Sequence, residues 1–327
     1  NRIATLLLFA FLTTAFTITD SYAQAERHFC GFDQLVQDLA VKHEAYGDAF
    51  RHSFDEAQEL GTAQTSAERN VVLTIPVVFH VVWNTNRPAE NLSDELVLEQ
   101  IAVLNEDYRK LNADAVNIRP EFADIAGDAM IQFELAEIVR VETTANYNNL
   151  VDLTDTDRVK RSAQGGSDAW DTENYLNIWA CKLPGNLLGQ LLGYAYPPAG
   201  LPNWPPLSSA PSPEVDGVVV DFRTVGRNNP NPLGGSYVAL GRTASHEVGH
   251  YLGLRHVWGD PIPIFQNGCQ VDDGVTDTPN AKDPSTSTNA VCGATRMSCN
   301  SLDMWENYMD YSQESCQVAF TEGQISI

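Results

Sequence analysis

The chain has 327 residues, of which 43% are hydrophobic, and a formal net charge of −23. This length allows one large domain or two lobes, and the apolar content is sufficient for a globular core. The acidic balance argues against nucleic acid as a partner, because a phosphate-binding surface requires a basic patch and none is visible. It is compatible with an exported protein that binds calcium or acts on cationic substrates.

The N-terminus predicts export. Residues 1–23 contain a short apolar run and end in a small-x-small pattern at Ala23, which is typical of a signal peptide rather than a membrane anchor. The six cysteines fit an oxidising compartment. We therefore expect a secreted monomer with no membrane anchor. The first residue is not Met and the last segment stops abruptly, so we expect both ends to be truncated.

Residues 24–69 are charged and rich in Ala, Glu and Gln, with no strand pattern, and we interpret them as a pro-segment. Regular structure is expected from Val71, where "VVLTIPVVFHVVW" predicts a strand buried on both faces. His80 within it is interpreted as a core histidine rather than a metal ligand. Ser93 then caps a predicted helix whose apolar positions follow helical spacing: Val97, Ile101, Leu104, Tyr108 and Leu111.

Four further strands are predicted, within residues 130–138, 174–183, 191–198 and 216–226. The strand within 191–198 is assigned to a sheet edge because prolines follow it. The Pro- and Ser-rich stretch 197–217 predicts a surface loop, which either flanks a cleft or is a plain connector. The pattern indicates an α/β (α+β) fold, with a sheet-and-helix upper lobe at 70–253 and an irregular lower lobe at 254–327.

The stretch "TASHEVGHYLGLRH" holds three of the seven histidines of the chain. On a helix, His246 and His250 lie at i and i+4 on one face and can bind one metal ion, while Glu247 can address a water molecule. Gly253 lets the chain leave the helix, so that His256 returns as a third ligand. Three protein ligands leave one position open, as catalytic zinc sites require. Incidental surface histidines are the alternative, and the fixed offsets of Gly253 and His256 argue against it.

The full string resembles the metzincin zinc peptidases, whose second hallmark is a methionine turn, supplied here by Met309 in "ENYMDYSQESC". Within the metzincins the chain resembles the pappalysin family and its cytophagalysin branch. The resemblance rests on "GRTASHEVGHYLGLRHVWGD", "VDDGVTDTPN", "ENYMDYSQESCQVAFTEGQ" and "LNIWACKLPGNLLGQLLGYAYPP", and it covers most of residues 70–327. It implies a metzincin fold, with residues 70–327 as a catalytic domain that hydrolyses peptide bonds of protein or peptide substrates.

The resemblance also implies roles for single residues. Met309 would form a hydrophobic floor under the zinc, and the phenol of Tyr311 would stabilise the oxyanion, unless that tyrosine is merely structural. Substrates are expected to add as a strand along the edge at 191–198. The pocket for the residue after the scissile bond would be lined by Glu314 and Ser315. Glu314 could favour Arg or Lys there.

The segment "CQVDDGVTDTPN" is dense in oxygen donors and predicts a calcium site, a solvated acidic turn being the alternative. The resemblance implies Asp273, Thr276 and Thr278 as ligands and leaves Asp272 and Asp277 open. It also implies two disulfides that tie the lower lobe together, Cys269 with Cys299 and Cys292 with Cys316. Cys181, in a strand-like segment, is expected to be a buried free thiol.

Cys30 is the only cysteine of the pro-segment, and its thiolate could occupy the open zinc position and keep the precursor latent. Two alternatives stay open: a disulfide between Cys30 and Cys181, or a blocking carboxylate of the pro-segment. Release would follow cleavage before Arg69. The sequence thus predicts a secreted zinc endopeptidase with Glu247 as general base. The rival prediction is a catalytically silent zinc-bearing adhesion or binding module on the same fold.

Overall fold

The computed structural model describes residues 28–43, 45–50, 52–53, 71–147, 153–186, 189–200, 209–233, 239–260, 267–286 and 292–327. The expected signal peptide at 1–23, the expected cleavage before Arg69 and residues 201–208 of the Pro- and Ser-rich loop lie outside these residues. Among the described residues, no helix is long and apolar enough to cross a membrane. The domain boundaries at 23/24 and 69/70 stay predictions.

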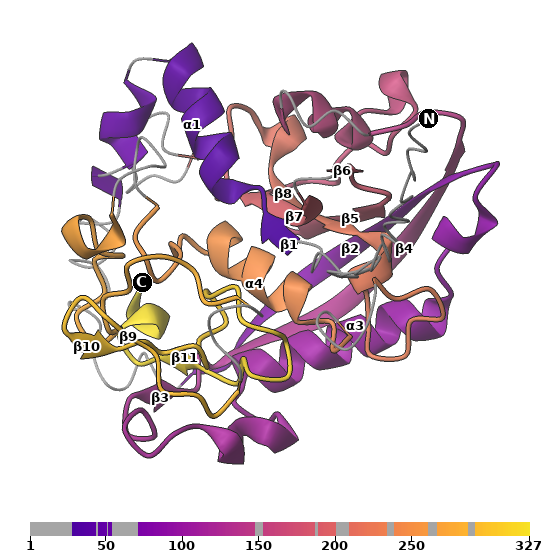
Figure 1. Cartoon of the computed structure of the whole chain (residues 1–327). Helices are drawn as coiled ribbons and strands as arrows, with labels where there is room; N and C mark the ends of the chain where they lie inside the picture. The colour runs from indigo at the N-terminus through magenta and orange to yellow at the C-terminus, as the bar shows by residue number, and fades with distance from the viewer. Residues whose placement is uncertain are drawn as a thin grey trace, which may run out of the picture.

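A twisted sheet forms the upper half of the molecule (Figure 1). Its strand order is β1-β7-β8-β5-β2-β4, and the short β6 pairs with β7. Strands β4, β2, β5 and β8 are parallel, whereas β7 runs antiparallel to β8. The strands span β1 His28–Cys30, β2 Leu73–Asn84, β4 Ile131–Thr143, β5 Leu176–Cys181, β6 Gly185–Asn186, β7 Gly189–Tyr196 and β8 Gly217–Asp221.

The helices α3 (Asp94–Tyr108) and α4 (Arg242–Tyr251) pack on one face of this sheet. Ser93 caps α3 as predicted, because its hydroxyl accepts a hydrogen bond from the Leu96 amide at 3.3 Å. The extension of this helix to Leu111 is wrong. The chain leaves the helix after Tyr108, Lys110 takes a φ of +49°, and the Leu111 side chain is 68% exposed.

The opposite face of the sheet packs against the N-terminal segment and its helix α1 (Phe32–Lys42). The absence of a strand pattern in this segment was misleading, because β1 is a strand of only three residues and is too short to show periodicity. It pairs in parallel with β7, the edge strand expected at 191–198. This pairing places the N-terminal segment beside the C-terminal half of the chain.

His80 is buried in β2 and is satisfied there, as expected of a core histidine. Its Nδ1 lies 2.8 Å from the Ser167 hydroxyl and its Nε2 lies 2.9 Å from Asn177 Oδ1. Cys181 is a buried free thiol in β5, also as expected. Neither residue reaches the histidine cluster described below.

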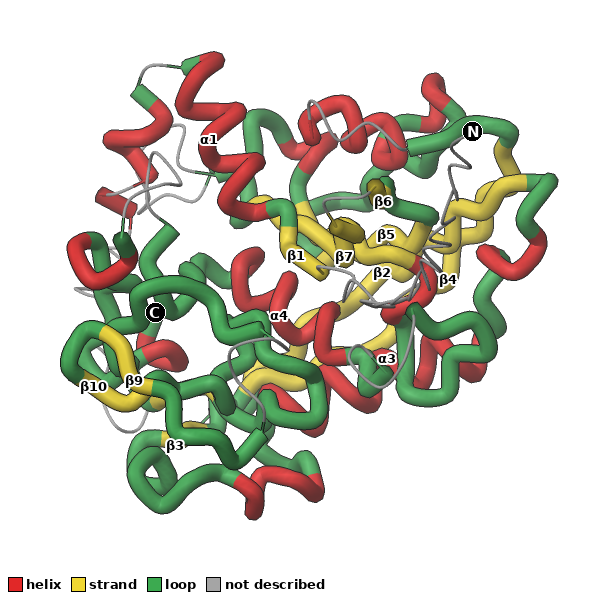
Figure 2. Tube along the Cα trace, viewed as in Figure 1, coloured by secondary structure: helices red, strands yellow, loops and turns green. Residues whose placement is uncertain are grey.

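The lower half is irregular, as Figure 2 shows by the loops that dominate it. It contains two small ladders, β9 (Met297–Ser298) with β10 (Ser301–Leu302) and β3 (Ala126–Gly127) with β11 (Phe320–Thr321). Disulfides join Cys269 to Cys299 and Cys292 to Cys316, the pairings that the resemblance implied.

Short 3₁₀ helices connect the elements of both halves. Among the described residues they are Pro88–Glu90, Ala113–Asn117, Leu153–Lys160, Ser162–Gln164, Pro213–Val215, Phe222–Thr224, Gly268–Gln270 and Gln324–Ser326.

Candidate active site

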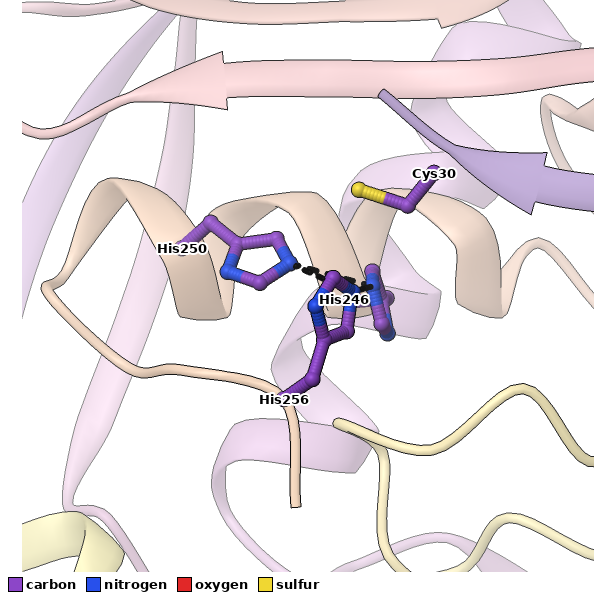
Figure 3. Close-up of side chains that lie close together, drawn as sticks. All are labelled: Cys30, His246, His250 and His256. Atoms are coloured by element: carbon purple, nitrogen blue, oxygen red, sulfur yellow. Dashed lines mark hydrogen bonds between the residues drawn. The ribbon is translucent and has the colours of Figure 1, made fainter. Parts of the chain in front are cut away.

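Three histidine rings converge below the edge of the sheet (Figure 3). His246 and His250 project from the same face of α4. The chain leaves this helix after Tyr251 and turns at Gly253, whose φ of +100° disfavours other residues, before it returns with His256. The three Nε2 atoms lie 3.1 to 3.2 Å from one another, and all three side chains are buried.

The outer nitrogen of each ring determines the protonation of the cluster. His246 Nδ1 lies 2.6 Å from the Tyr308 carbonyl, His250 Nδ1 lies 2.8 Å from the Leu254 carbonyl, and His256 Nδ1 contacts the carboxylate of Asp260. Because carbonyl and carboxylate oxygens accept hydrogen bonds, each Nδ1 carries the proton and each Nε2 presents a lone pair. Three lone pairs at this spacing repel one another unless a cation lies among them. The donor set therefore fits zinc.

Two residues that closely follow His256 in the chain, Trp258 and Asp260, contact its ring. Asp260 accepts hydrogen bonds from both Nδ1 and the backbone amide of His256, the latter at 2.9 Å. The Trp258 ring stacks on the imidazole with a centroid distance of 4.3 Å. Such partners of a metal-bound histidine fix its tautomer and orientation. Asp260 was missed as a site residue, although a carboxylate four positions after a ligand is a visible signal.

A buried network behind α4 holds His246. Asp107 of α3 accepts a hydrogen bond from Tyr308 at 2.8 Å and another from Ser245 at 2.6 Å. Tyr308 in turn supplies the carbonyl that His246 Nδ1 contacts, and Ser245 directly precedes His246. Asp107 is therefore linked to His246 by two routes, through Ser245 and through Tyr308. No sequence signal reveals this, because Asp107 lies 138 positions from Ser245 and 201 from Tyr308.

Glu247 lies beside the cluster and is fully buried. Its Oε2 accepts a hydrogen bond from the Cys30 thiol at 3.4 Å, and its Oε1 has no partner among the described residues. Burial raises the pKa of this carboxyl to about 8. Gly193 of β7 lies directly against it, since a Cβ at that position would be 2.7 Å from Glu247 Cγ. Gly193 was not singled out from the sequence.

Met309 is buried against the middle of α4. A Cβ on Gly249 would lie 2.4 Å from Met309 Sδ, so the absence of a side chain at Gly249 is what allows the sulfur this close. Tyr311 follows on the same turn, and its ring centroid lies 4.9 Å from that of His256. Its hydroxyl donates to the Cys30 carbonyl at 3.2 Å and to Asp33 at 3.3 Å. The methionine turn thus adjoins both the histidines and the N-terminal segment.

A pocket opens beside Glu247, lined in part by Leu192, Thr243, Tyr311 and Glu314. Glu314 is buried, and its carboxylate accepts hydrogen bonds from the amides of Leu240 and Thr243 at the start of α4. This carboxylate is therefore engaged by the protein itself. Ser315 is exposed and does not line the pocket.

In the segment expected to bind calcium, one carboxylate oxygen of Asp273 is buried without a hydrogen-bond partner among the described residues. Asp273 is 1% exposed; its Oδ1 accepts from the Val275 amide at 3.0 Å, while its Oδ2 has no partner among the described residues. Thr278 is buried nearby in sequence, but the Thr276 side chain is exposed. The carboxylate of Asp277 is used within the fold, where it accepts from the Thr321 hydroxyl and the Gly323 amide.

Comparison with known proteins decides the family. The profile of the peptidase family described as "Pregnancy-associated plasma protein-A" matches residues 231–327. "Extracellular metalloprotease 1" of Coccidioides posadasii is 31% identical over 281 residues, which cover 83% of this chain and 82% of that protein. The chain belongs to the pappalysin family. An extracellular metalloprotease of Pyricularia oryzae is 34% identical over 266 residues, covering 80% of this pappalysin and 75% of the relative.

Solved structures agree with this assignment. Mature mirolysin of Tannerella forsythia, in complex with a cleaved peptide, has a TM-score of 0.64 and 38% identity, covering 78% of this pappalysin and 90% of that chain. A promirolysin mutant of the same organism has a TM-score of 0.70 and 34% identity, covering 89% and 90%. The protein is a zinc metalloendopeptidase with a metzincin fold, and the predicted family and enzyme class are confirmed.

Proposed function

We propose that this pappalysin is secreted as a latent precursor and that its mature form cleaves peptide bonds with Glu247 as the general base. The observation that carries the proposal is the convergence of the Nε2 atoms of His246, His250 and His256 beside a buried carboxylate. Zinc held by these nitrogens would supply Lewis-acid polarisation of the scissile carbonyl. Extracellular relatives and the signal-like start of the chain support secretion.

Residues of the chain carry out the remaining steps, which are proton transfer, stabilisation of the oxyanion and binding of the substrate. Glu247 takes a proton from the attacking water and then delivers it to the leaving amide nitrogen. Tyr311, once released from Cys30 and Asp33, donates its phenolic proton in a hydrogen bond to the oxyanion. The substrate lies along β7, where β1 pairs in the precursor. The mirolysin bound to a cleaved peptide supports a peptide as the occupant.

The test compares casein and a peptide library as substrates, with and without a metal chelator, for the wild-type chain and for Glu247→Ala. We expect cleavage that the chelator and the substitution both abolish, with zinc still bound to Glu247→Ala. Cleavage that neither treatment affects would remove the proposed base. An inactive wild-type protein that binds zinc and peptides would instead favour the adhesion or binding module.

For latency, the structure favours the thiol of Cys30 over both alternatives. Its Sγ lies within 4.8 Å of ligand atoms of all three histidines, and Figure 3 shows the sulfur directed toward them. Cys30 and Cys181 are both free, so no disulfide joins them. Asp33 is placed on the other side of His256, 3.9 Å from Nδ1. The promirolysin, which covers more of this chain than mature mirolysin does, supports a precursor form.

Cys30→Ala tests this role directly, with Cys181→Ala as the matched control for loss of a buried free thiol. We expect the Cys30→Ala precursor to cleave casein or to process itself during expression, while Cys181→Ala stays as latent as the wild type. If both variants are equally latent, a group other than the Cys30 thiol keeps the precursor inactive.

Two finer features remain part of the proposal. The unpartnered Oδ2 of Asp273 supports a calcium site with oxygens of Thr276 and Thr278. Calcium should then raise the melting temperature and slow autolysis, and Asp273→Asn should abolish both effects. A preference for Arg or Lys after the scissile bond would draw on the negative charge of Glu314. A cleavage profile without enrichment of these residues would reject it.

A further inference from the structure

The pro-segment crosses the histidine cluster and leaves an aromatic side chain on each side of it. Phe29 lines the pocket beside Thr243 and Tyr311, at the N-terminal end of α4. Phe32 lies at the other end of this helix, where its ring stacks on His250 with a centroid distance of 3.9 Å and an interplanar angle of 11°. Cys30 lies between them, at the cluster itself. The two phenylalanines therefore mark opposite sides of the catalytic centre.

A third phenylalanine, Phe50, packs beside Phe32 and covers Arg255. The Phe50 ring lies 5.8 Å from that of Phe32, centroid to centroid. Arg255 makes two contacts with Phe50. The guanidinium carbon lies 4.5 Å from the centre of the Phe50 ring, and Nη2 donates a hydrogen bond to the Phe50 carbonyl at 2.6 Å. Arg255 is only 8% exposed beneath this cover. Removal of the pro-segment therefore uncovers an imidazole face and a guanidinium next to the reacting centre.

We propose that His250 and Arg255 form a substrate subsite that takes an aromatic side chain from the amino-terminal side of the scissile bond. The inference rests on the proposed function, because it assumes that substrates lie along β7 in the direction opposite to β1, with the residue after the scissile bond in the pocket beside Glu314. An aromatic ring can stack on the imidazole face as Phe32 does, or lie under the guanidinium as Phe50 does, two adjacent positions whose ring centres are 5.8 Å apart in the precursor. A substrate carbonyl takes the hydrogen bond that Phe50 accepts in the precursor.

The surroundings of Arg255 favour an aromatic over an acidic side chain. The positive charge of Arg255 already acts on Asp273, where it opposes the effect of burial on the pKa of that carboxyl. An acidic substrate residue would therefore meet a charge that is partly balanced. The flat face of His250 contributes apolar contact instead, and in the precursor both sides of this surface are covered by phenylalanine. Both side chains that occupy this surface in the precursor, Phe32 and Phe50, are aromatic.

The experiment uses the wild-type enzyme after limited proteolysis of the full chain has removed the pro-segment. Quenched fluorescent peptides carry Phe, Tyr, Leu, Asp or Ala at the first or second position before the scissile bond, in an otherwise constant sequence. We expect kcat/KM for Phe or Tyr to exceed that for Ala by roughly five- to thirtyfold at one position, the scale of a desolvated cation–π contact. Equal rates for Phe and Ala, or a preference for Asp, would overturn the subsite.

Arg255→Gln and Arg255→Lys then assign the preference to this residue. We expect Arg255→Gln to lose most of the Phe-over-Ala ratio, mainly through a higher KM for the Phe peptide, and Arg255→Lys to retain part of it. Arg227→Gln, which breaks an ion pair with Glu106 on the surface, is the matched control and should keep the ratio. An unchanged ratio in Arg255→Gln contradicts the proposal.

The peptide series on the wild-type enzyme needs no variant, so it decides the matter even if an Arg255 substitution destabilises the fold. If no peptide is cleaved in a chelator-sensitive way, the proposed function itself has failed, and this inference with it. If cleavage persists without an aromatic preference, only the subsite is refuted. Melting temperatures of the variants accompany the kinetics, so that loss of folded enzyme is not read as loss of preference.

Discussion

At the scale of single residues, the position of Glu247 depends on a missing side chain. Gly193 lies on β7 with Glu247 Cγ and Oε1 at 2.7 and 2.8 Å from where its Cβ would be. Real Cβ atoms do not tolerate such distances, so a side chain at this position would force Glu247 to shift. The absence of a side chain at Gly193 therefore allows β7 to pass directly beside Glu247, the proposed base.

Gly193→Ala should displace Glu247 and lower kcat by roughly ten- to hundredfold, because small misplacements of a reacting group are costly. KM and zinc content should change little. Steady-state kinetics with metal analysis provides the measurement. Gly200→Ala is the control, since its added methyl meets nothing within 4 Å and its φ of +70° affects stability rather than the site. A normal kcat in Gly193→Ala would show that Glu247 can move without consequence.

Asp216 makes stability depend on pH. The residue is 2% exposed, its Oδ2 accepts from the Ala199 amide at 2.9 Å, and burial raises its pKa to about 6 despite the charge of Lys160 nearby. A carboxyl whose pKa is raised by folding stabilises the fold fully below its unfolded pKa of about 4, and this contribution is lost as the pH rises through about 6.

Asp216→Asn should remove this dependence while the amide oxygen keeps the bond to Ala199. Relative to wild type, the variant should gain free energy of unfolding as the pH rises from about 4 to about 7, by up to about 3 kcal/mol. Denaturant unfolding at a series of pH values measures the difference. A constant difference across this range would mean that Asp216 does not titrate differently in the folded state.

At the scale of elements, α3 does more than cover the sheet. Its apolar face follows the helical spacing that the sequence shows, but its last turn carries Asp107, which bonds to Ser245 on α4 and to Tyr308 before the methionine turn. The helix thereby joins the two elements that hold His246. Positioning partners of metal ligands typically affect metal affinity when they are removed.

Asp107→Asn keeps the shape of the side chain and changes its charge and one acceptor. We expect zinc to bind up to roughly tenfold more weakly, as measured by competition with a chromophoric chelator. Glu99→Gln lies on the same helix but bonds to Arg227 and Asn228 instead of α4, so it should bind zinc normally. If both variants bind zinc equally well, α3 supports the fold and has no effect on the ligand.

At the scale of the whole molecule, the two halves are stabilised differently. The upper half buries a continuous apolar core between sheet and helices. Where the lower half is described, its strand ladders are two residues long and two disulfides cross-link it, so we expect the disulfides to contribute much of its stability. One of them, Cys292–Cys316, lies close in sequence to Glu314, which holds the start of α4.

Replacing Cys292 and Cys316 together by Ser should lower the free energy of unfolding by roughly 3 kcal/mol, because the bridge closes a loop with a sequence separation of 24. Thermal unfolding should show a melting temperature lower by several degrees. Cys181→Ala removes a sulfur that bridges nothing and should have a smaller effect. A double variant as stable as wild type would place the stability of the lower half in its other contacts.

The sequence by itself determined the five longer strands of the sheet, the Ser93 cap and the clustered histidines of α4, because helical and strand periodicity and the i, i+4 geometry are local. Resemblance added the methionine turn at Met309 and the disulfide pairing. Only the tertiary structure brought Asp107, Gly193 and Arg255 to the site, since each meets partners far away in the chain. It also showed that the carboxylate of Glu314 is bound by backbone amides. Such contacts depend on how the elements pack against one another, and packing between distant elements produces no repeating pattern in the sequence.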